Sequence, residues 1–499
     1  MPLTGVPEIR VRSVGPQQTA DRGGQYVLYW MTAARRTTWN FGLQRAVQWA
    51  RDLRKPVLVF EALRCGYRWA SDRLHQFVIQ GMADNERRLT RQDIRYYPYL
   101  EPEPGAGQGL LAELARHACV VVSDDFPCFF LPRMAAAAQR QIPTRFELVD
   151  SNGLLPMRAA DRTFVRAFDF RRFLQRNLVP YLQADAMPDE DPLGNGRSAV
   201  LDDLPRGVLR RWPAVKPGEV ARTPEHLRQF PIDHKVTPTS TAGGAEAAEA
   251  TLKQFLETRL PKYADARNEP EVEAASGLSP YLHFGHISVH QAFAETMQRA
   301  GWTPERISGK INGSSTGWWG VEPNTESFLD ELITWREVGY NMCSRTADYD
   351  QYESLPGWAR QTLEKHAADP REYVYTRDDF EAAQTHDPLW NAIQRQLLRE
   401  GRIHNYLRML WGKKVLEWSA CPQAALETLI ELNNKYALDG RNPNSYSGIF
   451  WVLGRYDRAW GPERPVFGTI RYMSSENTAR KVRVKDYVRR YGPAARLFE

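Results

Sequence analysis

The spacing of apolar residues changes once along this chain of 499 residues. Between residues 24 and 150, short apolar runs alternate with amphipathic stretches, which is typical of buried strands connected by helices. The predicted strands are residues 25–31, 56–61, 118–123 and 145–150, and the predicted helices are residues 39–53, 71–89 and 110–117. This alternation favours a parallel sheet with helices on both faces.

The second half of the chain has the period of helices alone. Six stretches carry an apolar stripe at helical spacing: residues 246–260, 280–299, 326–342, 388–400, 403–419 and 423–436. Asp387 followed by Pro388 is a typical helix start. Residues 308–324 are rich in Gly, Ser and Asn, which predicts an exposed loop.

The two patterns predict two domains joined by a long connection. Pro, Gly, Asp and Arg interrupt residues 185–245, which indicates an interdomain segment on the surface. The expected fold class is an α/β domain with a doubly wound parallel sheet, followed by an all-α domain. The expected parts are an N-terminal tail 1–23, an α/β domain 24–160, a linker 161–245 and a helical domain 246–499.

Composition excludes several classes of protein. The chain is too long for one hydrophobic core. Its five cysteines form no Cys-x-x-Cys pair, which argues for a reducing compartment and against a disulfide framework or a metal site. No signal pattern and no apolar run of membrane length is present, so a cytoplasmic protein without a membrane partner is expected, nuclear in a eukaryote.

The whole net charge of +6 lies at the C-terminal end. Residues 451–499 hold 11 Lys and Arg against five Asp and Glu, and the other 450 residues are neutral, 55 against 55. Aromatic residues lie among these charges, a combination that suits phosphate neutralisation beside base stacking. The alternative is a solvated basic tail.

Residues 438–448 form the most unusual short segment. Asp-Gly, Asn-Pro and Ser-Gly pairs turn the backbone repeatedly, and the segment also carries a carboxylate, a guanidinium and amides. So many donors and acceptors favour a loop that binds a ligand, although a self-bonded connection between helices remains an alternative. Ten of the 15 tryptophans lie between Trp302 and Trp460, on both sides of this loop.

The predicted sheet also marks a site. Ligands of doubly wound sheets bind at the carboxyl ends of the strands. Residues 30–32 and 123–125 follow two predicted strands, so we expect a pocket there. The chain contains no Gly-x-Gly-x-x-Gly motif, and an ordinary dinucleotide site is therefore not supported.

Several long motifs resemble one family. Residues 276–285, 385–392 and 438–444 resemble the flavin-binding segments of DNA photolyases. Residues 456–460 and 464–473 are similar specifically to class II cyclobutane pyrimidine dimer photolyases. The resemblance covers nearly the whole chain, except the linker and the 308–324 loop. It implies light-driven repair of pyrimidine dimers in double-stranded DNA by a monomer that uses FAD, in the cytoplasm and on the nucleoid if the source is bacterial.

The resemblance also implies a set of FAD-binding residues. Serines and backbone amides at a helix start suit a pyrophosphate. The implied pair beside the flavin ring is Arg408 with Asp439, and Asn433 is implied to face flavin N5, although spacing does not decide between Asn433 and Asn434. The complete set is Tyr263, Ser276, Gly277, Leu278, Ser279, Leu282, Arg408, Asn433, Asp439, Gly440, Arg441 and Asn444.

A dimer must leave the base stack before it can be repaired. Glu331 and Trp335 are four residues apart and share a helix face, which would offer a proton donor and a stacking surface. By the resemblance, Trp451 is a second stacking surface. Met409 and Arg267 also contact the dimer by the resemblance.

Two further sets follow from the family. Trp390, Trp411 and Trp418 are implied to pass electrons from the surface to oxidised flavin, whereas spacing alone favours core residues. Arg458, Trp460 and Arg471 are implied to enter the gap that the flipped dimer leaves in the duplex.

Two alternative functions and two questions remain open. A cryptochrome-like flavin photoreceptor without repair activity would share the cofactor, and a DNA-binding protein without catalysis would be colourless. The sequence decides neither whether the N-terminal domain holds an antenna chromophore, for which an 8-hydroxy-5-deazaflavin is the candidate, nor whether (6-4) photoproducts are repaired.

Overall fold

The chain forms two compact units in a computed structural model, which describes residues 5–194, 199–201, 203–204 and 206–493. The sheet unit comprises Met1–Asp161, Gln175–Lys253 and Leu278–Ile307. The helical unit comprises Arg162–Leu174, Gln254–Gly277 and Ser308–Glu499. The predicted fold class is confirmed: one unit holds a mostly parallel sheet with helices, and the other is helical.

Six strands form the sheet in the order β1-β6-β5-β2-β3-β4. Their bounds are β1 Val11–Val14, β2 Tyr26–Met31, β3 Val57–Leu63, β4 Arg95–Leu100, β5 Ala118–Asp124 and β6 Arg145–Val149. All neighbours are parallel except β1, which pairs antiparallel with β6. Both strands that the sequence did not predict, β1 and β4, are edge strands. β1 is short and lies in the expected tail, and Pro98 in β4 weakens the strand pattern because proline is confined to sheet edges.

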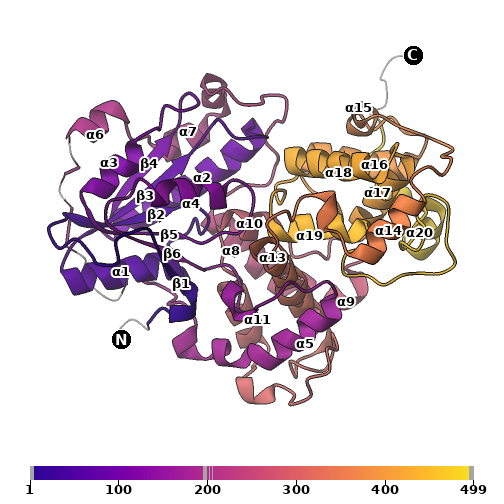
Figure 1. Cartoon of the computed structure of the whole chain (residues 1–499), viewed down its shortest axis with the longest axis horizontal. Helices are drawn as coiled ribbons and strands as arrows, with labels where there is room; N and C mark the ends of the chain where they lie inside the picture. Colours follow the sequence, from indigo (N-terminus) through magenta and orange to yellow (C-terminus); the bar gives the residue numbers. More distant parts are fainter. Residues whose placement is uncertain (1–4, 195–198, 202, 205, 494–499) are drawn as a thin grey trace. The chain divides into compact units, whose positions relative to one another are not determined.

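Helices cover both faces of this sheet (Figure 1). On one face, alternate residues of β2 such as Val27 and Tyr29 pack against α1. On the other face, Leu28 and Trp30 pack against α3 and α6. The helices of this part are α1 Phe41–Leu53, α2 Asp72–Arg91, α3 Leu110–Arg116, α4 Leu131–Gln139, α6 Arg206–Arg211 and α7 Pro217–Arg222. The buried strands thus read as continuous apolar runs, as expected of a sheet that is covered on both sides.

The strand order reverses between β2 and β5, where the sequence predicted a pocket. Asp124 lies at the end of β5, and its Oδ2 accepts hydrogen bonds from the backbone N–H groups of Thr32 (2.8 Å), Ala33 (2.8 Å) and Ala34 (3.0 Å). Tyr29 donates its hydroxyl to Oδ1 of the same carboxylate at 2.8 Å. Backbone amides that could hold an anionic ligand are therefore satisfied by a side chain of the chain itself.

The sheet unit also contains α8 Ala245–Gln254, which the division crosses at its last residue, α10 Ser279–Phe284 and α11 Val289–Arg299. The sequence predicted one helix over residues 280–299, but Gly285 ends α10 with φ 72°. A Cβ at Gly285 would lie 1.9 Å from the carbonyl oxygen of Ala33, so only glycine fits this approach. His286 follows, fully buried, and its Nδ1 accepts the N–H of Gly244 at 2.9 Å.

The helical unit holds the remaining helices and two π-helical turns, η6 Phe255–Arg259 and η9 Asp330–Trp335. The predicted helix 326–342 is found as α12, η9 and α13 in succession. The helices of this unit are α9 Tyr263–Ala266, α12 Pro323–Leu329, α13 Arg336–Arg345, α14 Gly357–Lys365, α15 Arg377–Glu381, α16 Pro388–Glu400, α17 Asn405–Trp418, α18 Pro422–Tyr436, α19 Pro443–Val452, α20 Ser475–Lys481 and α21 Lys485–Arg490; α5 Ala167–Asn177 crosses the division.

Two glycines let α19 pack closely between α13 and α17. A Cβ at Gly339 of α13 would lie 2.7 Å from the carbonyl oxygen of Pro443, and one at Gly412 of α17 would lie 2.4 Å from Val452 Cγ2. Real Cβ atoms do not approach so closely, so larger residues would push α19 away. This packing fixes α19, which carries Trp451, against α17, which carries Arg408, and against α13, which directly follows η9.

Residues 308–322 are irregular, as the sequence predicts for most of 308–324, but the segment is anchored rather than wholly exposed. Trp318 and Trp319 are buried, and Glu326 Oε1 accepts their backbone N–H groups at 2.9 and 3.2 Å. Among the described residues, no helix is both long and apolar enough to cross a membrane. Within the same residues, no three His, Cys, Asp or Glu side chains gather as a metal site would require.

Candidate functional site: an acidic and aromatic centre in the helical unit

Glu331 and Arg267 form an ion pair on the helical unit. Arg267 Nη2 lies 2.5 Å from Glu331 Oε1, and both side chains are about one quarter exposed, at 23% and 27%. Burial raises the pKa of Glu331, and the positive charge of Arg267 opposes this rise. The guanidinium carbon of Arg267 lies 5.6 Å from the ring centroid of Tyr263, which is buried. Glu331 sits in the π-helical turn η9, and such turns are frequent at functional sites.

Trp335 ends the same turn and stacks on Trp451 of α19. The ring centroids are 4.6 Å apart and the planes are inclined by 19°. Both rings are partly exposed. Glu331, Arg267, Trp335 and Trp451 therefore come together, as the sequence predicts, but the two indoles occupy each other's faces.

Arg408 and Asp439 also come together. Arg408 Nη2 donates to both carboxylate oxygens of Asp439, at 3.1 and 3.2 Å. The pair is partly rather than fully buried, with side-chain exposures of 26% and 18%. Met409 follows Arg408 on α17 and is partly exposed. The pair therefore has an exposed surface that a ligand could contact.

The two asparagines of α18 have different partners. Both polar atoms of the Asn434 side chain have hydrogen-bond partners. Its Oδ1 accepts from Arg441 N (2.8 Å) and its Nδ2 donates to Tyr446 Oη (3.1 Å). Asn433 donates its Nδ2 to Ser445 Oγ at 2.7 Å and to Asn434 Oδ1 at 3.1 Å. Its Oδ1 accepts no hydrogen bond from the residues that the structure describes. Asn433 is therefore the residue with an acceptor to spare, a distinction that spacing could not make.

The loop 438–448 partly bonds to itself. Arg441 is buried with φ 62°, and its guanidinium donates to carbonyl oxygens at the end of α18, including that of Ala437 at 3.3 Å. Gly440 lies against the backbone of Asn433, where a Cβ would approach the carbonyl oxygen to 2.7 Å. Asn444 is exposed and follows Asn442, which caps α19. In this loop the structure gives Arg441 a helix-capping role, and its contact with a cofactor stays a prediction.

The remaining predicted cofactor residues lie on both sides of the division between the units. Tyr263, Ser276 and Gly277 belong to the helical unit, and Gly277 has φ 76°. Leu278, Ser279 and Leu282 belong to the sheet unit, where Ser279 begins α10. Ser276 and Gly277 precede the N-cap Leu278 of α10, and Leu282 lies within that helix.

Trp390 links the other two tryptophans of its set. Its Nε1 donates to the backbone oxygen of Trp411 at 3.0 Å, and its ring lies 6.1 Å from that of Trp418. All three indoles are buried. The sequence placed Trp411 and Trp418 on one helix face, and the structure adds that Trp390 of α16 lies between them.

The aromatic series continues beyond Trp418 to residues that the sequence did not single out. Tyr375 and His386 lie 5.9 and 4.8 Å from the Trp418 ring, and Tyr373 stacks on His386 at 3.7 Å. Tyr373 is 37% exposed. These residues fall on short irregular segments without a periodic pattern, so the only signal in the sequence was their local density of rings.

Trp460, Arg458 and Arg471 come together at the surface of the helical unit. The two guanidinium carbons lie 4.9 and 5.4 Å from the Trp460 ring centroid, and this indole is 38% exposed. Asp457 fixes the indole by accepting from its Nε1 at 3.0 Å. A cationic, aromatic and exposed cluster of this kind can contact phosphates and stack on bases.

The comparison with curated proteins gives relatives that match over nearly the full chain. The chain is 32% identical to the "Deoxyribodipyrimidine photo-lyase" of Methanothermobacter thermautotrophicus, over 96% of this chain and 97% of the relative. It is 33% identical to the protein of the same name from Oryza sativa, over 96% and 89%, and 29% identical to that from Potorous tridactylus, over 97% and 85%. No family model matches the chain.

Solved structures give the same fold. A bacterial class III photolyase from Agrobacterium tumefaciens is similar with a TM-score of 0.66 and 17% identity, covering 96% of this chain and 87% of that one. A cryptochrome from Synechocystis is similar with a TM-score of 0.66 and 14% identity, covering 93% and 88%. At these identities the structures support the fold alone. With full-length relatives above 30% identity, the chain belongs to the deoxyribodipyrimidine photo-lyase family.

Proposed function

We propose that this protein repairs cyclobutane pyrimidine dimers in double-stranded DNA by light-driven electron transfer from bound FAD. The observation that carries the proposal is the gathering of Glu331, Arg267, Trp335 and Trp451 at one place on the helical unit. A carboxyl group with a raised pKa beside a guanidinium and two indoles suits a flat, polar and uncharged lesion. A plain DNA-binding surface would need cations and rings but no protonatable carboxyl group.

The residues of the helical unit fit a flavin. Asn433 offers an uncommitted amide oxygen, and the pair of Arg408 and Asp439 is partly exposed rather than sealed. Bound FAD would supply the light absorption and the electron that splits the cyclobutane ring. Ser276 and Gly277 of the helical unit would hold its phosphates.

The proposed lesion contacts are supported by where these side chains lie. Trp335 and Trp451 offer exposed indole surface for the dimer, and Met409 offers a soft apolar contact. Glu331 holds a proton more readily than an ordinary glutamate, since burial raises its pKa, and can donate it to a pyrimidine carbonyl. Arg267 keeps Glu331 oriented through their ion pair.

The aromatic series Trp411, Trp390 and Trp418 is proposed as the route by which electrons reach oxidised FAD. Trp390 bonds to the backbone of Trp411 and lies beside the ring of Trp418, so it connects the two residues. Rings that only filled a core would not need to lead towards the exposed Tyr373.

The cluster of Arg458, Trp460 and Arg471 is proposed to enter the gap in the duplex. The indole can replace lost stacking, and the guanidinium groups can contact phosphates or the unpaired bases. We further propose a monomer that acts on DNA in the cytoplasm. Whether an antenna chromophore of the 8-hydroxy-5-deazaflavin type binds the sheet unit is a separate question, which the absorption spectrum would answer.

The test is a repair assay with purified protein. Protein reconstituted with FAD and reduced should restore a dimer-containing duplex under near-ultraviolet or blue light and not in the dark. A protein that binds FAD and is photoreduced but repairs nothing would instead be a cryptochrome-like photoreceptor. Folded protein that neither copurifies with FAD nor takes it up would contradict both functions.

A further inference from the structure

Three glutamates alternate along the segment that leads into Ser276 and Gly277. Glu269, Glu271 and Glu273 are each separated by one residue. We call residues 267–277 the cofactor segment, because its last residues are proposed to hold the FAD phosphates. Each of the three carboxylates has partners in a distant part of the helical unit.

Glu271 caps the C-terminal helix α21. Its Oε1 accepts the backbone N–H groups of Asp486 at 2.6 Å and Tyr487 at 3.3 Å, which lie in the first turn of the helix. Glu269 accepts the backbone N–H of Arg483 at 3.2 Å. First-turn N–H groups have no partner within their own helix, and a carboxylate satisfies them while its charge complements the helix dipole.

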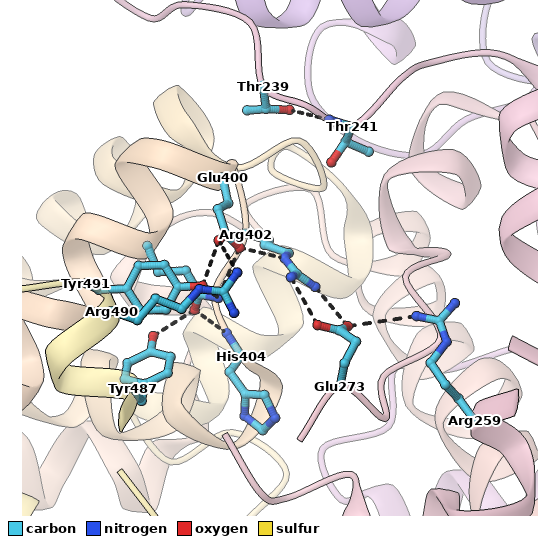
Figure 2. Close-up of polar contacts among 11 residues, drawn as sticks. Thr239, Thr241, Arg259, Glu273, Glu400, Arg402, His404, Tyr487, Arg490 and Tyr491 are labelled. Atoms are coloured by element: carbon cyan, nitrogen blue, oxygen red, sulfur yellow. Dashed lines mark hydrogen bonds and ion pairs between the residues drawn. The ribbon is translucent and has the colours of Figure 1, made fainter. Parts of the chain in front are cut away.

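Two buried tyrosines fix α21 against α16. Tyr487 donates its hydroxyl to Gln396 Oε1 and Tyr491 donates to Glu400 Oε1, both at 2.7 Å. Both rings are at most 4% exposed. Burial raises the pKa of Tyr491 to about 12, so its hydroxyl stays a donor at neutral pH. Figure 2 shows these tyrosines beside Glu400.

Arg402 completes the link between α16 and the cofactor segment. Its Nη1 and Nη2 donate to the two carboxylate oxygens of Glu273, at 3.1 and 3.2 Å, and its Nε donates to Glu400 Oε2 at 3.0 Å (Figure 2). Arg259 of η6 lies 3.8 Å from Glu273 on its other side. Although burial alone would raise the pKa of Glu400, the hydrogen bond from Tyr491 and the charge of Arg402 lower it.

The same contacts reach the start of α17. Gln396 Oε1, which accepts from Tyr487, also accepts the backbone N–H of His404 at 3.0 Å. His404 precedes α17, the helix that carries Arg408. A single amide of α16 therefore fixes both α21 and the helix whose arginine is proposed to face the flavin.

We propose that residues 483–491 are a positioning element for FAD, holding the cofactor segment in place through Glu271 and, by way of Glu400 and Arg402, through Glu273. The proposal rests on the proposed function. Exposed ion pairs contribute little individually. The buried tyrosines and the helix cap make the element act as a unit, so that loss of one contact loosens the others. FAD release then depends on residues that do not touch FAD.

The experiment compares FAD release from Glu271→Ala with release from the wild type. Loss of the cap should raise the rate of FAD release on dilution, measured by the fluorescence of free FAD. Glu271→Gln, which retains an acceptor oxygen, should restore part of the retention. Glu427→Ala, at an exposed position of α18, is the matched control and should release FAD at the wild-type rate. Should Glu271→Ala fail to fold, Tyr487→Phe removes a single hydroxyl and should have the same direction of effect.

A second readout does not require FAD. In FAD-free protein, hydrogen exchange at residues 269–277 and at Asp486 and Tyr487 should accelerate together in Glu271→Ala. Faster exchange confined to α21, or FAD release at the wild-type rate from Glu271→Ala and Tyr487→Phe, would overturn the positioning role and leave the proposed function intact. A folded wild-type protein that takes up no FAD would overturn the proposed function itself, and this inference with it.

Discussion

Trp335 and Trp451 stack on each other with ring centroids 4.6 Å apart. A base inserted between two rings requires the rings to lie about twice the usual stacking distance apart. The centroids of Trp335 and Trp451 are instead as close as those of a directly packed aromatic pair. A flipped dimer must therefore pack against an outer face or an edge of this pair, or separate it. The two indoles act as one surface rather than as two independent ones.

If the indole pair is one surface, either alanine substitution should damage it. Trp335→Ala and Trp451→Ala should each lose about 1–3 kcal/mol of binding to a dimer-containing strand, roughly 5- to 150-fold in affinity. FAD content should not change. The measurement is titration of dimer-containing and undamaged strands at one salt concentration; equal losses on both strands would assign the pair to general DNA binding.

Asp439→Ala should weaken FAD retention. The substitution leaves Arg408 without its carboxylate in a partly buried place, and hydrogen bonds to charged groups contribute about 1.5–3 kcal/mol. The ratio of flavin to protein absorbance after gel filtration measures the effect. Asp439→Asn keeps the shape of the side chain, and its absorbance ratio should lie between those of the wild type and Asp439→Ala. A wild-type ratio in Asp439→Ala would exclude the pair from the flavin site.

Trp411→Phe should slow the photoreduction of oxidised FAD without abolishing repair. Phenylalanine fills much of the same volume but is far harder to oxidise. Protein reduced chemically before the assay should repair dimers at the wild-type rate, because the route is then not needed. Photoreduction at the wild-type rate would make Trp411 a core residue only.

Arg471→Ala should weaken binding to dimer-containing duplex more than to undamaged duplex. Arg471 contacts the exposed ring of Trp460, so the substitution removes both a cation and the support of the indole. Lys481→Ala removes one exposed positive charge at the end of α20 and is the control. The salt concentration must be fixed, since electrostatic binding depends on it steeply. An equal proportional loss of affinity for both duplexes would mean that Arg471 contributes only its positive charge.

Acid should destabilise the sheet unit through His286. Burial, together with the charges of Arg35 and Arg36, lowers the pKa of His286 to about 3, against an ordinary value of 6.5. Between these values the unfolded chain binds a proton that the folded chain does not, so the free energy of unfolding falls as the pH falls. From pH 7 to pH 5 the loss should be about 2 kcal/mol.

His286→Gln should remove the contribution of His286 to this pH dependence and leave that of His75, whose pKa burial lowers to about 4. The substitution also lowers stability at neutral pH. Denaturant unfolding at both pH values measures the slope, and exposed His226→Gln is the control. The same slope in His286→Gln as in the wild type would mean that other groups cause the acid sensitivity.

Much of the fold could be read from apolar periodicity, because both the buried strands and the helices α16, α17 and α18 carry regular patterns. Edge strands β1 and β4 escaped prediction, since each is only half covered and one holds a proline. The interruption of helix 280–299 at Gly285 depends on a contact with the backbone of Ala33, far away in sequence. A local pattern contains no information about such a contact.

The candidate site shows the same limit. The resemblance supplied Glu331, Trp335 and Trp451, but not that the two indoles stack on each other. Spacing could not choose between Asn433 and Asn434, whereas their hydrogen-bond partners distinguish them. Tyr373, Tyr375 and His386 form part of the aromatic series only through tertiary contacts.

Asp124 supplies the anionic partner of the backbone amides at the end of the sheet. In many doubly wound folds, a ligand binds in the crevice at this position of the sheet. Here the carboxylate of Asp124 occupies three backbone amides at that position. These three amides are therefore satisfied within the folded chain without a bound phosphate.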